Sequence, residues 1–128
     1  MPKHIPKDQY SANPYEIVPN GYIHPDIEHH DHAEEEAHYL LPAVFSSDKG
    51  LSVKGKYPGP GVYYITDGEL HFEDSANPGS VTVVKAGSVV HIEEGAVIHW
   101  KVGPGVKGFA VFNVPVSVKS FDEFVVPE

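Results

Sequence analysis

The sequence has no cysteine and no arginine, and it has no long hydrophobic run. The absence of cysteine excludes a disulfide framework, a thiolate metal site and a thiol nucleophile. Nine lysines against eighteen acidic residues give a net charge of −9, and a chain that also lacks the bidentate fork of arginine is poorly suited to nucleic acid or to an anionic membrane surface. No segment approaches the roughly 18 apolar residues of a membrane span, and the amino terminus has no apolar signal-peptide core. We therefore expect a soluble cytoplasmic protein.

Glycine and proline, by contrast, are abundant, with twelve of each among 128 residues. A chain of this length forms one domain with one hydrophobic core. Beyond residue 50, short β-branched runs alternate with turn signals such as PGPG, DG, NPGS and GPGVKG. The runs are LSVKGKY, GVYYIT, ELHFE, SVTVVK, SVVHIE, AVIHWKV and GFAVFNVPVSV. With no helix between them, they are expected to pair antiparallel, which predicts an all-β sandwich or small barrel.

The first 45 residues have a different composition. Five prolines fall within residues 1–25, too close together for a helix, and they indicate an arm laid over a surface. Residues 26–39, DIEHHDHAEEEAHY, are the only stretch that suits a helix, because Asp26 can cap it and acidic residues follow in its early turns. We expect an amino-terminal arm at residues 1–45, with room for one short helix at 26–39, and a barrel at residues 46–128.

Two glycine-containing turns follow each other along the barrel segment. Residues 64–68 (YITDG) form the first, and Gly87 and Gly95 supply the glycines of the second motif. Over about residues 50–115 this pattern resembles the cupin superfamily, in which a Tyr-Val-Leu-x-Gly-like turn is followed by a motif that begins Gly-Asp and continues to Pro-x-Gly. The resemblance implies a double-stranded β-helix, a small jelly-roll barrel whose mouth holds the site. Among cupins, the chain is most similar to the metal-poor, EutQ-like single-domain members.

The metal ligands that cupins usually carry are missing from the matching positions. The resemblance places the His-x-His pair at Lys54 and Lys56, and the glutamate at Gly61. The last histidine position falls on Ile98, while His99 lies one residue away, on the other face of a regular strand. A protonated lysine has no lone pair to offer a metal. We therefore expect no cupin-type metal site and no cofactor.

Three candidate catalytic residues follow from this comparison, namely Lys54, Lys56 and His99. In a partly apolar pocket, a lysine can act as a general base, stabilise an enolate or anchor a carboxylate. The alternative is that both ammonium groups reach solvent from a strand edge. A register shifted by one residue would instead place Gly55 and Tyr57 inside the barrel.

Aromatic residues supply the candidate binding wall. Tyr63 and Trp100 share the inward phase of the former ligand positions, and Tyr57 and Ile98 complete the candidate set. In a barrel that has lost its metal, such side chains could stack against a planar ligand. The alternative is that they are ordinary core residues.

Histidine is over-represented, with nine copies, and five of them lie between residues 24 and 38. These are His24, His29, His30, His32 and His38. In a helix, His30, Glu34 and His38 would line one face, where a His/Glu pair can bind zinc or copper; the alternative is a solvated acidic segment with incidental histidines. Farther along, Glu69 and His71 could form an acid–base pair if they face the lumen, or be ordinary outward polar residues if they do not.

The residues and the resemblance together favour an enzyme. We expect a metal-independent lyase, isomerase or cyclase acting on a small oxygenated or carboxylated molecule in the barrel lumen, with lysine stabilising the developing negative charge. A second interpretation is a non-catalytic accessory protein that binds a small molecule, because no complete catalytic constellation is present. A third retains a metal, bound by His99 and other histidines. Since exposed sheet edges need covering, we also expect a homodimer.

Overall fold

The computed structural model describes His4, Pro6 and residues 15–18, 21–25, 38–118 and 121–127. Within them the chain forms ten strands and one short 3-10 helix. The strands are β1 (Tyr15–Val18), β2 (Gly21–Pro25), β3 (His38–Asp48), β4 (Ser52–Lys56), β5 (Gly61–Asp74), β6 (Val81–Lys85), β7 (Val89–Ile92), β8 (Val97–Lys101), β9 (Gly105–Pro115) and β10 (Val125–Val126), and the helix is η1 (Phe121–Phe124). No helix in this part of the chain is long and apolar enough to cross a membrane.

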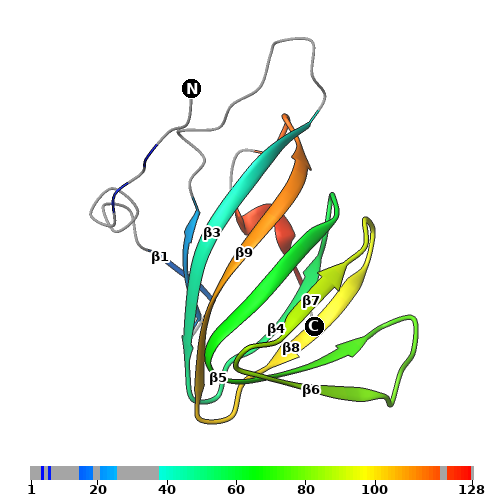
Figure 1. Ribbon diagram of the computed structural model, residues 1–128. Helices are drawn as coiled ribbons and strands as arrows, with labels where there is room; N and C mark the ends of the chain where they lie inside the picture. Colours follow the sequence, from blue (N-terminus) through cyan, green and yellow to red (C-terminus); the bar gives the residue numbers. More distant parts are fainter. Residues whose placement is uncertain are drawn as a thin grey trace.

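All ten strands belong to one antiparallel sheet. The strand order is β1-β2-β3-β9-β5-β8-β4-β10, and β6 and β7 also pair with β5. Figure 1 shows the sheet curled into a half-barrel, with β3 and β9 in one wall, β4 and β8 in the other, and η1 on the inner side. The all-β fold predicted from the turn-separated runs is therefore confirmed.

The longest strand, β5, takes part in both walls. Its first half pairs with β7 and β9, and its second half pairs with β6 and β8. Between the halves the register shifts at a bulge between Ile65 and Asp67. Gly68 follows with a φ of 82°, and a Cβ there would lie 2.2 Å from the carbonyl oxygen of Gly105, so only glycine fits. The sequence indicated two runs separated by a turn at this point. One continuous strand bends there instead, because the left-handed glycine serves a bulge and not a chain reversal.

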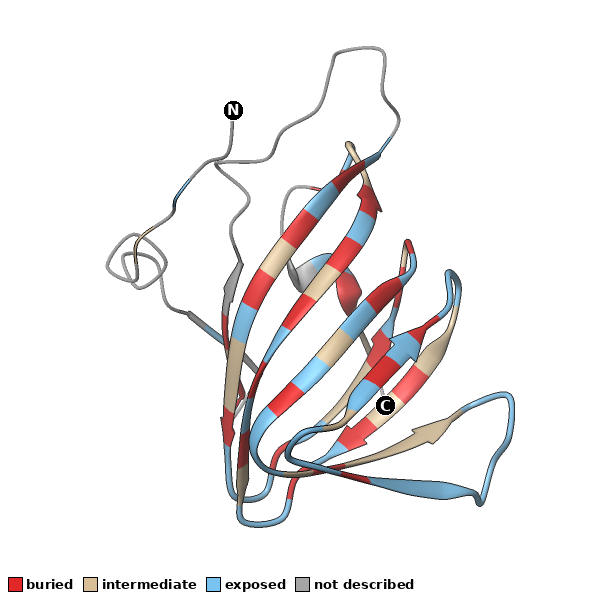
Figure 2. Cartoon of the chain, in the orientation of Figure 1, coloured by how far each residue is buried: buried red, intermediate tan, exposed pale blue. Residues whose placement is uncertain are grey.

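The core lies on the inner side of the curl. Burial alternates residue by residue along β3 and β9, as Figure 2 shows. The largest fully buried side chains are Phe112, Leu41, Ile65 and Val114. Ile98 and Trp100 are buried too, as the period-two pattern of their strand predicted. The interior is therefore apolar and aromatic.

The amino-terminal predictions fall partly outside the described residues. Residues 26–37, which hold most of the predicted helix, lie outside them. The last two residues of that predicted helix, His38 and Tyr39, begin β3 instead, because burial there alternates with a period of two. The expected boundary at residue 45 falls inside β3, which pairs with β9 along its whole length and with β2 at its other edge. Residues 21–25 and 38–45 are thus strands of the same sheet.

Candidate functional site

The inner side of the half-barrel holds a cavity of about 100 Å³. Its walls come from both halves of the sheet and from the carboxyl-terminal segment, and they include Ser47, Gly55, Tyr57, Tyr63, Trp100 and Phe124. None of the lining residues in the described part of the chain is charged. An engineered protein cavity of about 150 Å³ accommodates benzene. The cavity therefore suits a molecule of about four to six non-hydrogen atoms, provided that its body is largely apolar.

The register of β4 decides which of its side chains face the cavity. Val53 pairs with Trp100, and Gly55 pairs with Ile98, so these residues share the inner face. Of the two registers that the sequence left open, the structure therefore has the second, with Gly55 and Tyr57 inside. The candidate catalytic residues Lys54 and Lys56 lie on the opposite face, Lys54 half-buried and Lys56 exposed.

Three predicted site residues form one hydrogen-bonded chain beside the cavity. The indole Nε1–H of Trp100 donates to the phenolic oxygen of Tyr57 at 2.7 Å. The two phenolic oxygens of Tyr57 and Tyr63 lie 2.7 Å apart, and either group can be the donor. The rings also pack against one another, with centroids 5.0 Å apart for Tyr63 and Trp100. The structure thus brings three of the four aromatic and apolar candidates together beside the cavity, and they carry two hydroxyl groups.

Both phenols are held in their neutral form. Burial raises the pKa of Tyr57 to about 12, although the hydrogen bonds from Tyr63 and Trp100 act in the opposite direction. Burial and the neighbouring Tyr57 raise the pKa of Tyr63 well above its usual value. A neutral phenol can donate one hydrogen bond and accept up to two. At physiological pH the pair therefore serves as a donor and acceptor of hydrogen bonds and not as a phenolate base.

A further hydroxyl at the cavity was not expected from the sequence. Ser47, on β3, lines the cavity and is only 7% exposed. Its Oγ has no hydrogen-bond partner within the described residues. A buried hydroxyl without a partner costs about 1–3 kcal/mol. The Oγ itself is buried, so Ser47 leaves an unsatisfied hydroxyl in the cavity wall that a ligand or a water molecule reaches only after the side chain turns toward the cavity.

The register brings Lys54 and His99 together, but on the outer face. They are direct partners across β4 and β8, and Glu73 of β5 follows in the same row. Lys54, His99 and Glu73 line a separate hollow of about 290 Å³, in which Ser75 and Pro78 also take part. The Oγ of Ser52 lies 2.9 Å from Nε2 of His99. Two of the three candidate catalytic residues thus share a site that is distinct from the aromatic cavity.

The remaining polar candidates also lie away from the lumen. Glu69 and His71 face outward on β5 and contact each other at 2.7 Å between Oε1 and Nε2. They form the outward polar pair that the sequence offered as one alternative. Of the five clustered histidines, His29, His30 and His32 lie outside the described residues, and His38 is exposed at the start of β3.

The residues around the cavity do not fit a metal ion. No group of three or more His, Cys, Asp or Glu side chains that could hold a metal occurs among the described residues. The inward-facing positions on β4, β5 and β8 include Val53, Gly55, Tyr63, Ile98 and Trp100. The only oxygen donors of the aromatic chain are phenols that stay protonated, and protonated phenols are poor metal ligands.

No protein-family model and no curated protein matches the sequence of this chain. Solved structures do match its fold. An RmlC-like cupin from Shewanella frigidimarina has a TM-score of 0.68 and 15% identity, and the match covers 91% of this chain and 95% of the other. EutQ from Clostridium difficile has a TM-score of 0.59 and 14% identity, over 84% of this chain and 80% of the other.

A third match is the DMSP lyase DddQ from Ruegeria pomeroyi, with a TM-score of 0.55 and 17% identity. It covers 62% of this chain and 41% of the lyase. At these identities the likeness concerns the fold alone. The chain has the cupin fold, as the order of its glycine turns predicted, and it shares this fold with the RmlC-like cupin and with EutQ.

Proposed function

We propose that the protein binds a small, neutral, oxygen-bearing organic molecule in the half-barrel cavity. The observation that carries this proposal is an apolar cavity with hydroxyl groups in its walls, contributed by Ser47 and by the pair Tyr57 and Tyr63. An apolar pocket with a few polar groups is the usual form of a small-molecule site. The apolar wall supplies affinity, and the hydroxyl groups fix the orientation of the ligand.

The hydroxyl groups leave hydrogen-bonding capacity for a ligand. Tyr57 accepts from Trp100, and one phenolic proton of the tyrosine pair is used in the bond between the two oxygens. Two phenols have two protons, so one donor of the pair is left over whichever way that bond points. Ser47 adds a second hydroxyl. A carbonyl, ether or hydroxyl oxygen on the ligand would match these groups.

The uncharged lining of the cavity restricts the class of ligand further. The sequence suggested a small oxygenated or carboxylated molecule, with lysine available to meet an anion. Lys54 and Lys56 lie on the opposite face of β4, so no lysine of the described residues reaches the cavity. Burying an unpaired carboxylate costs several kcal/mol. Of the two ligand classes expected from the sequence, we therefore retain the neutral oxygenated molecule and not the carboxylated one.

Lyase or isomerase chemistry is the second candidate. A neutral phenol that donates to a carbonyl oxygen stabilises the enolate formed when a proton leaves the adjacent carbon. The leaving proton also needs a base, and the described lining offers no carboxylate, imidazole or amine to accept it. The likeness to a DMSP lyase supports this candidate at the level of the fold. Because the base is missing from the lining, we place binding first.

Calorimetric titration with matched probes tests the proposal. Cyclopentanone has a compact apolar ring and one carbonyl oxygen, while isobutyrate carries a negative charge on a molecule with the same number of non-hydrogen atoms. We expect the ketone, or a related small alcohol or phenol, to bind saturably, and we expect the carboxylate not to bind. Gly55→Val should abolish binding, because Gly55 lines the cavity; Lys56→Val, one residue away on the outer face, is its matched control. Binding of the carboxylate alone, or equal binding to the Gly55→Val protein, would overturn the proposal.

A further inference from the structure

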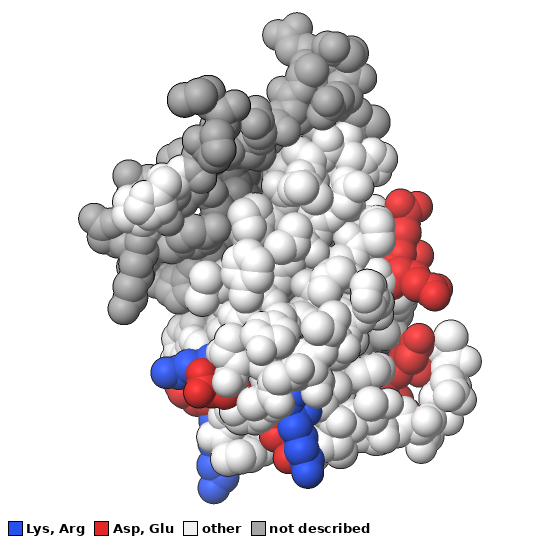
Figure 3. Space-filling view, in the orientation of Figure 1, with Lys and Arg blue, Asp and Glu red and all other residues white. Residues whose placement is uncertain are grey.

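The hollow on the outer face of β4, β5 and β8 differs in character from the aromatic cavity. Its volume of about 290 Å³ is close to the lower end of the roughly 300–1,000 Å³ that is typical of small-molecule sites. We call it the outer hollow, and its lining residues are Lys54, Glu73, Ser75, Pro78 and His99. The segment between β5 and β6 supplies Ser75 and Pro78, and Figure 3 shows exposed acidic side chains in this part of the molecule. The outer hollow therefore has an ammonium group and a carboxylate in its walls.

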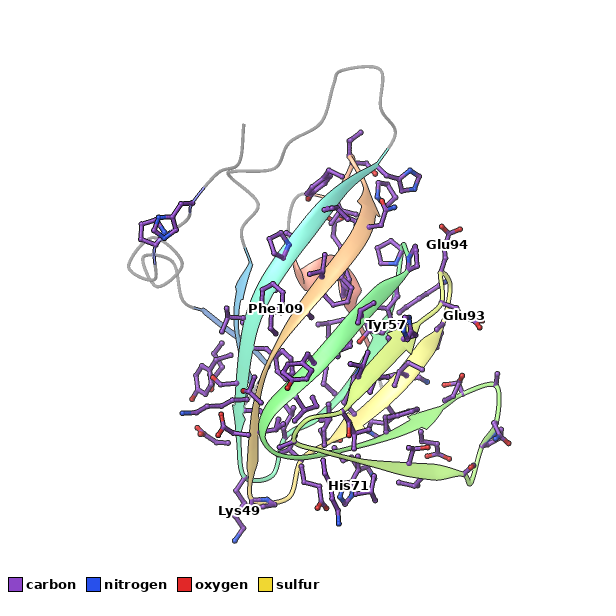
Figure 4. All side chains as sticks on the ribbon, viewed as in Figure 1. Lys49, Tyr57, His71, Glu93, Glu94 and Phe109 are labelled. Atoms are coloured by element: carbon purple, nitrogen blue, oxygen red, sulfur yellow. The ribbon has the colours of Figure 1, made fainter. Side chains whose placement is uncertain are left out.

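Three neighbouring strands bring these opposite charges into one row. Lys54 on β4 pairs with His99 on β8, and His99 pairs with Glu73 on β5. All three residues are half-buried. Figure 4 shows His71, which shares the outward phase of Glu73 on β5, on the side of the sheet away from Tyr57. The row thus has an ammonium group at one end, an imidazole in the middle and a carboxylate at the other end.

The charged groups of the row keep the capacity to bind a ligand. Within the described residues, the ammonium group of Lys54 takes part in no ion pair or hydrogen bond. Oε2 of Glu73 accepts the backbone N–H of Gly79, and this bond leaves Oε1 open. The Oγ of Ser52 lies 2.9 Å from Nε2 of His99 and restrains the imidazole ring between the two charges. The carboxylate and the imidazole are therefore held in position, while the ammonium group and one carboxylate oxygen face the hollow without a partner.

We propose that the outer hollow binds a small amino acid in its zwitterionic form. Lys54 binds the carboxylate of the ligand, Glu73 binds its ammonium group, and the body of the ligand lies over His99. Adjacent strands are about 4.8 Å apart, so the two charged residues stand about 10 Å apart at their Cα atoms. Two charge-assisted hydrogen bonds of about 2.8 Å each leave about 4 Å between the charged atoms of the ligand when both side chains stand parallel. A compact amino acid such as β-alanine matches this spacing.

The pairing of opposite charges selects against ligands with a single charge. A simple anion meets the carboxylate of Glu73 as well as Lys54, and the net charge of −9 repels it from the whole molecule. A simple cation meets the ammonium group of Lys54. A zwitterion satisfies both groups and has no net charge. This site lies on the opposite face of the sheet from the aromatic cavity, and its ligand differs from the neutral molecule proposed there.

Nuclear magnetic resonance titration of ¹⁵N-labelled protein with three probes of similar size tests the proposal. At neutral pH β-alanine carries both charges, propionate only the negative charge and propylamine only the positive charge. We expect β-alanine to shift the amide signals of Lys54, Glu73 and Gly79 saturably, with a dissociation constant in the millimolar range, because the charged groups are partly exposed to water. Propionate and propylamine should bind at least about tenfold more weakly.

Two variants that each remove one charge distinguish recognition from a structural effect. Lys54→Met and Glu73→Gln should each weaken the binding of β-alanine by at least about tenfold, although glutamine can still accept the N–H of Gly79. The preference should also change with the remaining charge: propylamine should bind Lys54→Met as well as β-alanine does, and propionate should do so with Glu73→Gln. Lys56→Met is the matched control, because Lys56 is exposed on the same strand but does not line the outer hollow.

Three results would overturn the proposal. They are β-alanine that shifts no signal at the outer hollow, propionate or propylamine that binds the unmodified protein as tightly as β-alanine, and a loss of binding in Lys56→Met as large as in Lys54→Met. Gly55→Val fills the aromatic cavity on the opposite face and should leave the binding of β-alanine unchanged. The two sites are therefore tested separately.

Discussion

Removing the hydroxyl of Tyr57 should cost much more stability than removing the hydroxyl of Tyr63. Tyr57 accepts the indole N–H of Trp100 and shares a second hydrogen bond with Tyr63. In Tyr57→Phe both bonds are lost, and the N–H of Trp100 stays behind at a site that is 5% exposed. Each lost bond costs about 1 kcal/mol, and an unsatisfied buried donor adds about 1–3 kcal/mol. We expect a loss of about 3–5 kcal/mol for Tyr57→Phe and of about 1 kcal/mol for Tyr63→Phe.

Urea unfolding followed by tryptophan fluorescence and circular dichroism measures both losses. Tyr64→Phe is the matched control, because Tyr64 neighbours Tyr63 on β5 but is 44% exposed on the outer face; its effect should stay within about 0.5 kcal/mol. The double variant Tyr57→Phe/Tyr63→Phe should cost less than the sum of the single changes, since the two residues share one bond. Equal losses for Tyr57→Phe and Tyr63→Phe would refute the hydrogen-bonded chain as the source of the effect.

Further predictions concern ionisation and packing. The pKa of Tyr57 is about 12 in the folded protein and about 10 in the unfolded chain, so the unfolded state loses its phenolic proton at a lower pH. The contribution of Tyr57 to the free energy of unfolding should therefore fall between about pH 10 and about pH 12, by on the order of 2–3 kcal/mol. Urea unfolding at stepped pH should show a smaller fall for Tyr57→Phe. Phe124→Ala should lower the free energy of unfolding by about 3–5 kcal/mol in the same assay, because the ring centroids of Phe124 and Phe112 lie 5.2 Å apart. A loss below about 1 kcal/mol would mean that η1 does not pack against Phe112. Gly61→Ala should lower the melting temperature, because a Cβ there would lie 2.3 Å from Cδ1 of Phe112, whereas Gly103→Ala meets nothing within 4 Å and should not.

The fold was predictable because its signals are local. Short alternating runs and closely spaced turn residues require strands that reverse direction often, and Gly87 and Gly95 both adopt the positive φ that such turns demand. The sequence does not reveal the bulge in β5, because an Asp-Gly pair looks the same in a sequence whether the chain reverses or bends. Only the pairing of β5 with β6, β7, β8 and β9 distinguishes the two.

The register of β4 shows how a physical signal can be stronger than a motif count. Counting from the first turn placed Lys54 and Lys56 at the positions where cupins carry ligands. The alternation of LSVKGKY instead places Leu51, Val53 and Tyr57 on one face, and that face is the buried one. The alternation of apolar and polar residues follows directly from which face of the strand is buried. A motif count depends on exact spacing, so one inserted or deleted residue assigns every side chain of the strand to the wrong face.

Other parts of the site could not be read from the sequence. Ser47 lies near the end of a long strand, where many serines are exposed, and only the pairing of β3 with β2 and β9 turns it toward the cavity. Phe124 lies well after the last long strand of the sheet. It reaches the cavity because the two residues that follow it form β10, which pairs with β4. Contacts between such distant positions depend on the curled geometry of the whole sheet.

The fluorescence of Trp100 tests the central claim most directly, because it is the only tryptophan in the sequence and it lines the cavity. Titration with cyclopentanone and related small neutral ketones, alcohols and phenols should give a saturable change in its intensity or wavelength. The change should disappear in Gly55→Val and persist in Lys56→Val. A fluorescence that no neutral probe alters, or that responds equally in the Gly55→Val protein, would contradict the assignment of the cavity as the binding site.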